Sequence, residues 1–190
     1  MRQDPDLPRR RSVRLPEYDY AQPGAYFVTI CAHEKKHLFG RISGDAMRLS
    51  GPGKIVDECL REIPAHFPNA KVPIRVVMPN HANGIVVIDA SGSPSARTKK
   101  LSEAAEKLGA HQVRSLPVII RSFKAISARR IREKFGVPTS EIWQRGYYER
   151  VIRTREEFGK TWEYIRLNLA TWNSDSENPG RAPAETMAAT

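Results

Sequence analysis

Hydrophobic and polar residues alternate over short distances in several stretches of the chain. Residues 25–32 (AYFVTICA), 72–78 (VPIRVVM) and 84–88 (GIVVI) combine this spacing with β-branched and aromatic residues. Such segments are typical of β-strands. A shorter stretch at 38–42 is predicted to complete a hairpin with the first strand, and residues 142–152 are compatible with a strand or a loop.

Three longer segments carry hydrophobic residues at helical spacing. These are residues 53–67, 115–135 and 155–172, and Ser115 is in a position to cap the second segment. The resulting order is β-β-α-β-β-loop-α-β-α. It favours an α+β fold, a ferredoxin-like antiparallel sheet with helices packed on one face. A parallel doubly wound sheet would require a regular alternation of strands and helices, which this order lacks.

The segments outside this pattern suggest one domain with flexible additions. Residues 1–22 contain five arginines and three prolines and are predicted to form a basic flexible arm. The domain itself spans 23–172. Residues 89–111 are rich in Gly, Ser and Lys, which indicates a flexible insertion. Residues 173–190 show no periodicity and are predicted to be a disordered tail.

The charge balance favours a polyanionic partner. Among 190 residues, 31 are Lys or Arg and 21 are Asp or Glu, which gives a net charge of +10. Nucleic acid is the first candidate for such a partner, and an acidic membrane surface is the second.

Other features of the composition exclude whole classes of protein. No apolar run exceeds four residues, so a transmembrane helix is not expected. The charged, proline-broken start leads us to expect no secretory signal. Two cysteines, Cys31 and Cys59, are too few for a disulfide framework or a four-cysteine zinc site. We therefore expect reduced thiols in a cytoplasmic protein.

The segment MPNHANG (78–84) contains the first candidate site. His81 and Asn83 are two residues apart, so on a strand their side chains point to the same face. Imidazole nitrogen and amide oxygen form a mixed ligand pair that suits Mg or Mn better than a structural zinc ion. The alternative is that both are hydrogen-bonded residues of a turn.

The final helix contains the second candidate site. Tyr164 and Asn168 are four residues apart and therefore share one helix face. A tyrosine in this position can act as a nucleophile with Asn168 as a neighbouring metal ligand. The alternative is a half-buried tyrosine whose hydroxyl group simply reaches solvent.

Two further segments suit contact with nucleic acid. One face of helix 115–135 is cationic and is predicted to follow phosphates, unless it is only a solvated face. Segment 143–150 (WQRGYYER) interleaves aromatic residues with arginines, which suits stacking on single-stranded bases, unless its aromatics pack in the core. The predicted DNA-binding residues are Arg121, Lys124, Arg129, Arg130, Trp143, Arg145, Tyr147, Tyr148 and Arg150.

Taken together, these segments resemble one family. The likeness covers most of residues 18–172 and is carried by MPNH followed by GIVVI, by WQRGYYERVIR, and by YI-x-x-N in the final helix. The family is the REP-associated tyrosine transposases, a branch of the single-tyrosine HUH transposases that also serve short insertion sequences.

The resemblance implies an enzyme that binds single-stranded or hairpin (REP-like) DNA. Such an enzyme cleaves and rejoins DNA through a 5′-phosphotyrosine intermediate, as a monomer or homodimer. By position, Tyr164 matches the nucleophile, His81 and Asn83 match the two HUH ligands, and Asn168 completes the metal site. The family usually has histidine where this chain has Asn83, so we expect Mg or Mn to bind weakly.

This departure keeps other functions open. A non-cleaving, domesticated protein that binds hairpin DNA through a degraded HUH metal site is the main alternative. A protein that binds RNA through the same sheet and aromatic residues is a third.

Overall fold

The computed structural model describes residues 18–20, 22–89 and 115–180. The predicted arm (1–22) and the predicted insertion (89–111) therefore lie almost entirely outside the described residues. Within the described ranges, no helix combines the length and apolar character needed to cross a bilayer.

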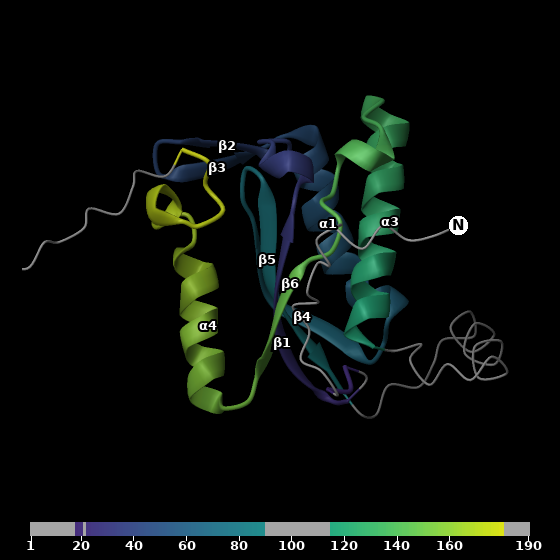
Figure 1. Ribbon diagram of the computed structural model, residues 1–190, viewed down its shortest axis with the longest axis vertical. Helices are drawn as coiled ribbons and strands as arrows, with labels where there is room; N and C mark the ends of the chain where they lie inside the picture. The colour runs from purple at the N-terminus through teal and green to yellow at the C-terminus, as the bar shows by residue number, and fades with distance from the viewer. Residues whose placement is uncertain (1–17, 21, 90–114, 181–190) are drawn as a thin grey trace, which may run out of the picture.

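One antiparallel sheet organises the domain (Figure 1). Its strands are β1 (Gly24–Cys31), β4 (Ala70–Val77), β5 (His81–Ile88) and β6 (Tyr148–Ile152), in the spatial order β4-β5-β1-β6. All neighbours pair antiparallel. With the helices between them, these strands form the β-α-β-β-α-β arrangement of ferredoxin-like folds, so the predicted fold class is confirmed.

The predicted hairpin between the first strand and residues 38–42 is wrong. β2 (Gly40–Ser43) pairs instead with β3 (Ala46–Leu49) in a separate two-stranded sheet. Both edges of β1 are already occupied by β5 and β6. After β1 the chain also turns away through η1 (His33–Lys35), where Glu34 and Lys35 adopt φ angles of 52° and 54°.

Helices cover both faces of the main sheet. α1 (Gly51–His66) and α3 (Leu116–Phe135) pack together on one face, as predicted, whereas α4 (Arg155–Leu167) lies on the opposite face (Figure 1). The expectation that all helices pack on one face is therefore wrong for α4. The physical reason is that β1 is apolar on both sides, so each face must be buried.

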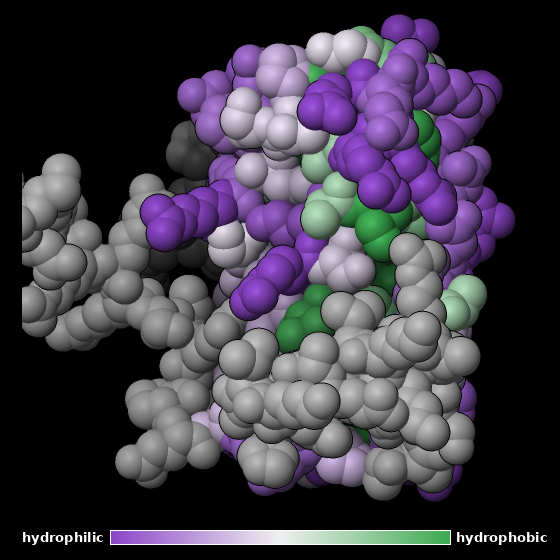
Figure 2. Space-filling model, turned by 90° about the vertical axis from the view of Figure 1, so that its right-hand side faces the viewer, coloured by the Kyte–Doolittle hydropathy of each residue, from purple (hydrophilic) through white to green (hydrophobic). Residues whose placement is uncertain are grey.

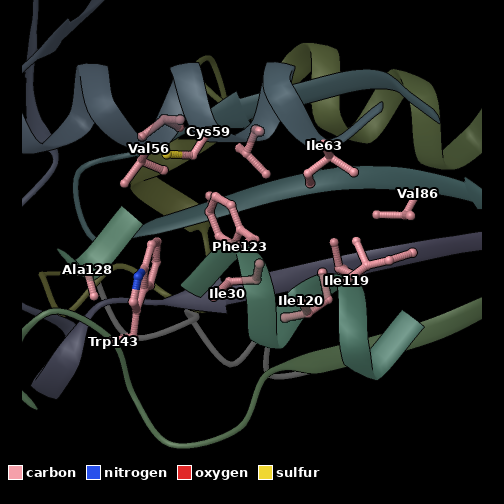
Figure 3. Close-up of a cluster of buried hydrophobic side chains, with 14 of the residues drawn as sticks. Ile30, Val56, Cys59, Ile63, Val86, Ile119, Ile120, Phe123, Ala128 and Trp143 are labelled. Atoms are coloured by element: carbon pink, nitrogen blue, oxygen red, sulfur yellow. The ribbon is translucent and has the colours of Figure 1, made fainter. Parts of the chain in front are cut away.

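The alternation of side chains along β1 divides the hydrophobic residues into two clusters. Val28 and Ile30 face α1 and α3 and join the larger cluster, which includes Phe123 and Trp143 (Figure 3). Phe27 faces α4 and joins a smaller cluster with Ile85, Ile152 and Ile165. The second cluster fixes α4 over the sheet and thereby determines which residues of the final helix can meet β5.

The start of α1 is held by a close backbone approach. Ser50 caps the helix, because its Oγ accepts a hydrogen bond from Gly53 N at 3.1 Å and donates one to Leu38 O at 2.7 Å. A Cβ atom on Gly53 would lie 1.9 Å from the carbonyl oxygen of Phe39, so only glycine fits here. Gly159 in α4 is different, since a Cβ there would meet no atom within 4 Å.

The same substitution is expected to have opposite effects at these two glycines. Gly53→Ala should lower the free energy of unfolding by about 1–3 kcal/mol, because backbone must move to admit the methyl group. Gly159→Ala should raise it by about 0.5–1 kcal/mol, because alanine restricts the unfolded chain and favours helix. Urea unfolding measures both. Equal changes in the free energy of unfolding for the two substitutions would contradict the close approach of Gly53 to the carbonyl oxygen of Phe39.

Candidate functional site

The register of the sheet places the candidate residues on the face that α4 covers. Asn83 of β5 lies opposite Thr29 of β1, and Thr29 lies opposite Tyr148 of β6. His81 lies opposite Cys31 in the next row on the same face. Three strands therefore bring residues that are distant in sequence to one end of the sheet.

The hydrogen bonds around His81 define its tautomer. Asn80 donates both of its amide hydrogens, to Lys35 O at 3.3 Å and to Glu177 O at 2.7 Å, so its Oδ1 must act as the acceptor toward His81 Nδ1 at 2.9 Å. His81 Nδ1 then carries the proton. Its Nε2 lone pair is free to accept a hydrogen bond from Asn83 Nδ2 at 3.1 Å.

The imidazole of His81 is neutral at pH 7. Its side chain is fully buried, and this desolvation lowers the pKa of His81 below its usual value. The carboxylates of Asp175 and Glu177 oppose the shift without cancelling it. A neutral imidazole with Nε2 unprotonated is the form that can bind a metal ion or accept a hydrogen bond.

Two hydrogen-bond acceptors converge on the side-chain nitrogen of Asn83. Asn83 Nδ2 donates to His81 Nε2 at 3.1 Å and to Asn168 Oδ1 at 3.0 Å. Asn83 Oδ1, in contrast, is buried and has no hydrogen-bond partner among the described residues. An unsatisfied buried carbonyl costs about 1–3 kcal/mol, so this oxygen is available as an acceptor or as a ligand atom.

These residues fit a divalent cation after one local change. A half-turn of the Asn83 amide exchanges Oδ1 and Nδ2, so that His81 Nε2 and two amide oxygens are adjacent. In that orientation these three residues would hold a divalent cation between one nitrogen and two oxygen ligands, a donor set that suits Mg or Mn. No cluster of three or more His, Cys, Asp or Glu side chains suited to a metal occurs in the described part of the chain, so the amides of Asn83 and Asn168 are essential to such a site.

Tyr164 projects from α4 beside these amides. It is 44% exposed, and its ring packs edge-on against Phe27 with centroids 5.7 Å apart. Partial burial raises the pKa of Tyr164, and the charge of Asp175 raises it further, whereas hydrogen bonding with the amides of Asn168 and Asn83 acts in the opposite direction. The phenol is therefore protonated at neutral pH and lies next to both asparagines.

Residues 172–180, named here the C-terminal strap, close one side of the site. The strap begins with η3 (Trp172–Ser174), and the ring of Trp172 stacks on His81 with centroids 5.9 Å apart. Its buried Asp175 accepts a hydrogen bond from Asn168 Nδ2 at 3.3 Å. We expected a disordered tail from residue 173, but the folded domain extends at least to Gly180; residues 181–190 lie outside the described residues.

The strap also contacts the end of β1. Glu177 Oε2 accepts a hydrogen bond from Cys31 Sγ at 3.1 Å and pairs with Lys35 Nζ at 3.2 Å. Burial raises the pKa of Cys31 to about 12, and the hydrogen bond with Glu177 adds to this shift. Sequence reasoning missed Asp175 and Glu177, because polar composition without periodicity gave no signal that this segment packs. It placed Trp172 at the end of the final helix, whereas α4 ends at Leu167 and Trp172 begins η3.

Of the predicted DNA-binding residues, Tyr148 and Arg150 share the face of the candidate site. Tyr148 is 47% exposed, and its ring centroid lies 6.3 Å from that of Phe27. Arg150 is exposed, lies 6.0 Å from the same ring, and donates a hydrogen bond to Thr161 Oγ1 at 2.9 Å. The two side chains extend the site outward along β6.

The remaining predicted DNA-binding residues lie elsewhere. In the part of the α3 side that Figure 2 does not colour grey, hydrophilic residues predominate, with some hydrophobic residues between them. Arg121 and Arg129 of α3 are exposed. This helix is separated from Tyr164 by the sheet (Figure 1). On it, Lys124 donates hydrogen bonds to Gln144 O at 2.6 Å and Gly146 O at 2.9 Å, and Arg130 pairs with Glu62 at 2.7 Å. Both of these cations therefore have structural partners.

In the predicted aromatic segment, the core alternative holds for Trp143. Its indole is buried between Phe39 and Phe123 and donates a hydrogen bond to Ser127 Oγ at 3.0 Å. Tyr147 packs partly against the same core, whereas Arg145 is exposed in the loop before β6. Tyr147 precedes β6 and packs on the larger cluster, whereas Tyr148, the first residue of β6, lies opposite Thr29 and faces the site.

Comparison with known proteins places the chain in a family. It is 36% identical over 171 residues to an uncharacterized protein of Haemophilus influenzae, and the match covers 87% of this chain and 91% of that protein. The chain belongs to the same family as this protein. No protein-family model matches it.

Two solved structures are similar to this chain at low sequence identity. One is a REP-associated tyrosine transposase bound to a REP hairpin, with a TM-score of 0.49 and 17% identity over 83% of this chain and 74% of that one. The other is a candidate transposase from Deinococcus radiodurans R1, with a TM-score of 0.46 and 13% identity over 80% of this chain and 95% of that one. Both similarities concern the fold alone.

The lowered pKa of His81 predicts a pH dependence of stability. Between the folded pKa and the unfolded value near 6.5, the unfolded state binds a proton that the folded state rejects. The free energy of unfolding should therefore fall as the pH drops through this range. Urea unfolding between pH 5 and 8 tests this, with His81→Gln as the control. The variant should show a smaller slope, and an unchanged slope would assign the dependence to other groups.

Proposed function

We propose that this protein is a DNA strand transferase that cleaves and rejoins single-stranded or hairpin DNA through Tyr164. One observation carries the proposal: the phenol of Tyr164 lies beside a buried group of ligand atoms from His81, Asn83 and Asn168. The motifs that resemble those of tyrosine transposases contain these same four positions, with Asn83 where the family usually has histidine, and they support the same function.

The proposed reaction needs no external energy source. Tyr164 Oη attacks a backbone phosphorus, the new Oη–P bond forms as the P–O3′ bond breaks, and the phenol proton is transferred through water to the leaving 3′ oxygen. The 5′-phosphotyrosine bond preserves the energy of the phosphodiester, so a 3′ hydroxyl can reverse the step and rejoin the strand. His81, Asn83 and Asn168 would hold a divalent cation, which neutralises charge on the scissile phosphate when bound.

The surroundings of Tyr164 suit a single strand of DNA. Tyr148 offers an exposed ring on which a base can stack, and Arg150 adds a positive charge in the neighbouring row on the same face of the sheet. The net charge of +10 favours phosphate binding in general. In this proposal, the DNA passes along β6 to reach Tyr164.

A non-cleaving hairpin-binding protein is the second candidate function. The observation that favours it is the amide nitrogen of Asn83, which occupies the point where His81 and Asn168 converge. In this arrangement both acceptors are satisfied by the chain itself. Such a protein would retain the DNA-binding face without the covalent step.

Two variants that each lose one hydroxyl group test the nucleophile. With labelled hairpin single-stranded DNA and Mg or Mn, wild type should form a covalent adduct that survives a denaturing gel. Tyr164→Phe should abolish the adduct and bind DNA within about twofold of wild type, because the ring remains. Tyr148→Phe is the matched control and should still form it. An adduct that persists in Tyr164→Phe and disappears in Tyr148→Phe would identify Tyr148 as the nucleophile.

The variant Asn83→His distinguishes the two candidate functions. If wild type forms no adduct with any divalent metal while Asn83→His does, the wild-type chain is a DNA-binding protein with a degraded site.

Charge reversal on either side of the sheet tests the path of the DNA. Arg150→Glu should weaken binding to the hairpin about tenfold or more at low salt and flatten the dependence of affinity on salt. Arg132→Glu, an equal charge change at an exposed position of α3, should weaken binding less. Fluorescence anisotropy at several salt concentrations measures both. A larger loss for Arg132→Glu would place the DNA on the α3 side.

A further inference from the structure

The candidate site contains no carboxylate or thiolate ligand. His81 contributes an imidazole nitrogen that accepts a hydrogen bond from Asn83, and Asn83 and Asn168 contribute amides. A divalent ion transferred from water to a buried site loses much of its hydration, and neutral ligands compensate only part of that loss. A nearby negative charge would make binding more favourable.

The C-terminal strap brings two carboxylates close to these ligands. Glu177 is paired with Lys35, and both side chains are partly exposed to solvent. Asp175 is 7% exposed, and no Lys or Arg forms an ion pair with it within residues 18–20, 22–89 and 115–180. Its charge is therefore the one beside the site that no cation of the described chain balances.

Asp175 also controls the orientation of Asn168. Its Oδ1 accepts a hydrogen bond from the backbone N–H of Glu177 at 2.7 Å, which holds the carboxylate in place. Its Oδ2 accepts from Asn168 Nδ2 at 3.3 Å. Because the amide nitrogen of Asn168 is directed to Asp175, its oxygen is directed to Asn83.

We propose that Asp175 is a positioning and charge-balancing residue for a divalent cation held by His81, Asn83 and Asn168. The proposal deepens the proposed function, since it concerns the same site, and it adds a residue from a segment outside the motifs. Independently, Asn83 Oδ1 is buried without a hydrogen-bond partner among the described residues, and in the turned amide this oxygen would face the cation. A carboxylate that orients a ligand of this kind is worth about ten- to a hundredfold in metal affinity.

Binding of Mn²⁺ to the full chain without DNA tests the proposal. Electron paramagnetic resonance measures free Mn²⁺ during a titration of wild type, Asp175→Asn and Glu177→Gln. Asp175→Asn should weaken binding about tenfold or more. Glu177→Gln removes an equal charge from the strap and should weaken it about threefold or less, since this carboxylate is partly exposed and contacts no proposed ligand. Equal losses in both variants, no loss in Asp175→Asn, or no binding by wild type would each overturn the proposal.

Two further measurements separate a direct effect from displacement of the strap. Alkylation of Cys31, followed by peptide mass spectrometry, reports whether Glu177 still covers this thiol. The alkylation of Cys31 should stay slow in Asp175→Asn. Adding Asn168→Asp to Asp175→Asn restores a negative charge among the ligands and should recover most of the lost affinity. Rapid alkylation without such recovery would show that Asp175 only anchors the strap. The adduct assay with DNA is independent, so failure here leaves the proposed function to be judged by that assay.

Discussion

The central position of β1 is the constraint on which the rest of the structure depends. Both of its edges are hydrogen-bonded and both of its faces are apolar, so the domain must supply a strand on each side and a layer of helices on each face. The first requirement excludes β2 from the main sheet. The second brings α4 onto the face where β5 begins. The meeting of Tyr164 and Asn168 with His81 and Asn83 follows from this packing.

The site shows how a buried polar network constrains the side chains that compose it. Backbone carbonyls of Lys35 and Glu177 orient Asn80, Asn80 fixes the tautomer of His81, and His81 accepts from Asn83. Each hydrogen bond determines the role of the next group, because a buried donor or acceptor without a partner is costly. The chain of constraints ends at Asn83 Oδ1, where the described protein atoms provide no partner.

The sequence predicted which side chains share a face within one strand or one helix, but not how the helices pack on the sheet. Strand and helix periods placed His81 with Asn83 and Tyr164 with Asn168, but no period tells which face of a sheet a helix will cover. Trp143 illustrates the difficulty, since an aromatic residue beside arginines has the same pattern whether it stacks on bases or packs in a core. Asp175 was hidden for another reason: its contact is with Asn168 on a different element, and polar residues without periodicity are typical of tails.

The amide of Asn83 can face His81 Nε2 and Asn168 Oδ1 in two orientations, one with its nitrogen and one with its oxygen. With Nδ2 directed inward, the amide takes the place of a cation and leaves its oxygen unpaired. With Oδ1 directed inward, the amide becomes a ligand and its N–H groups face outward, where they can donate to a phosphate oxygen. In neither orientation do the described residues satisfy every donor and acceptor of this amide. The pairing of a cation with a phosphate is one combination that would satisfy the second orientation, and the role that we propose for Asp175, a negative charge behind Asn168, would favour it.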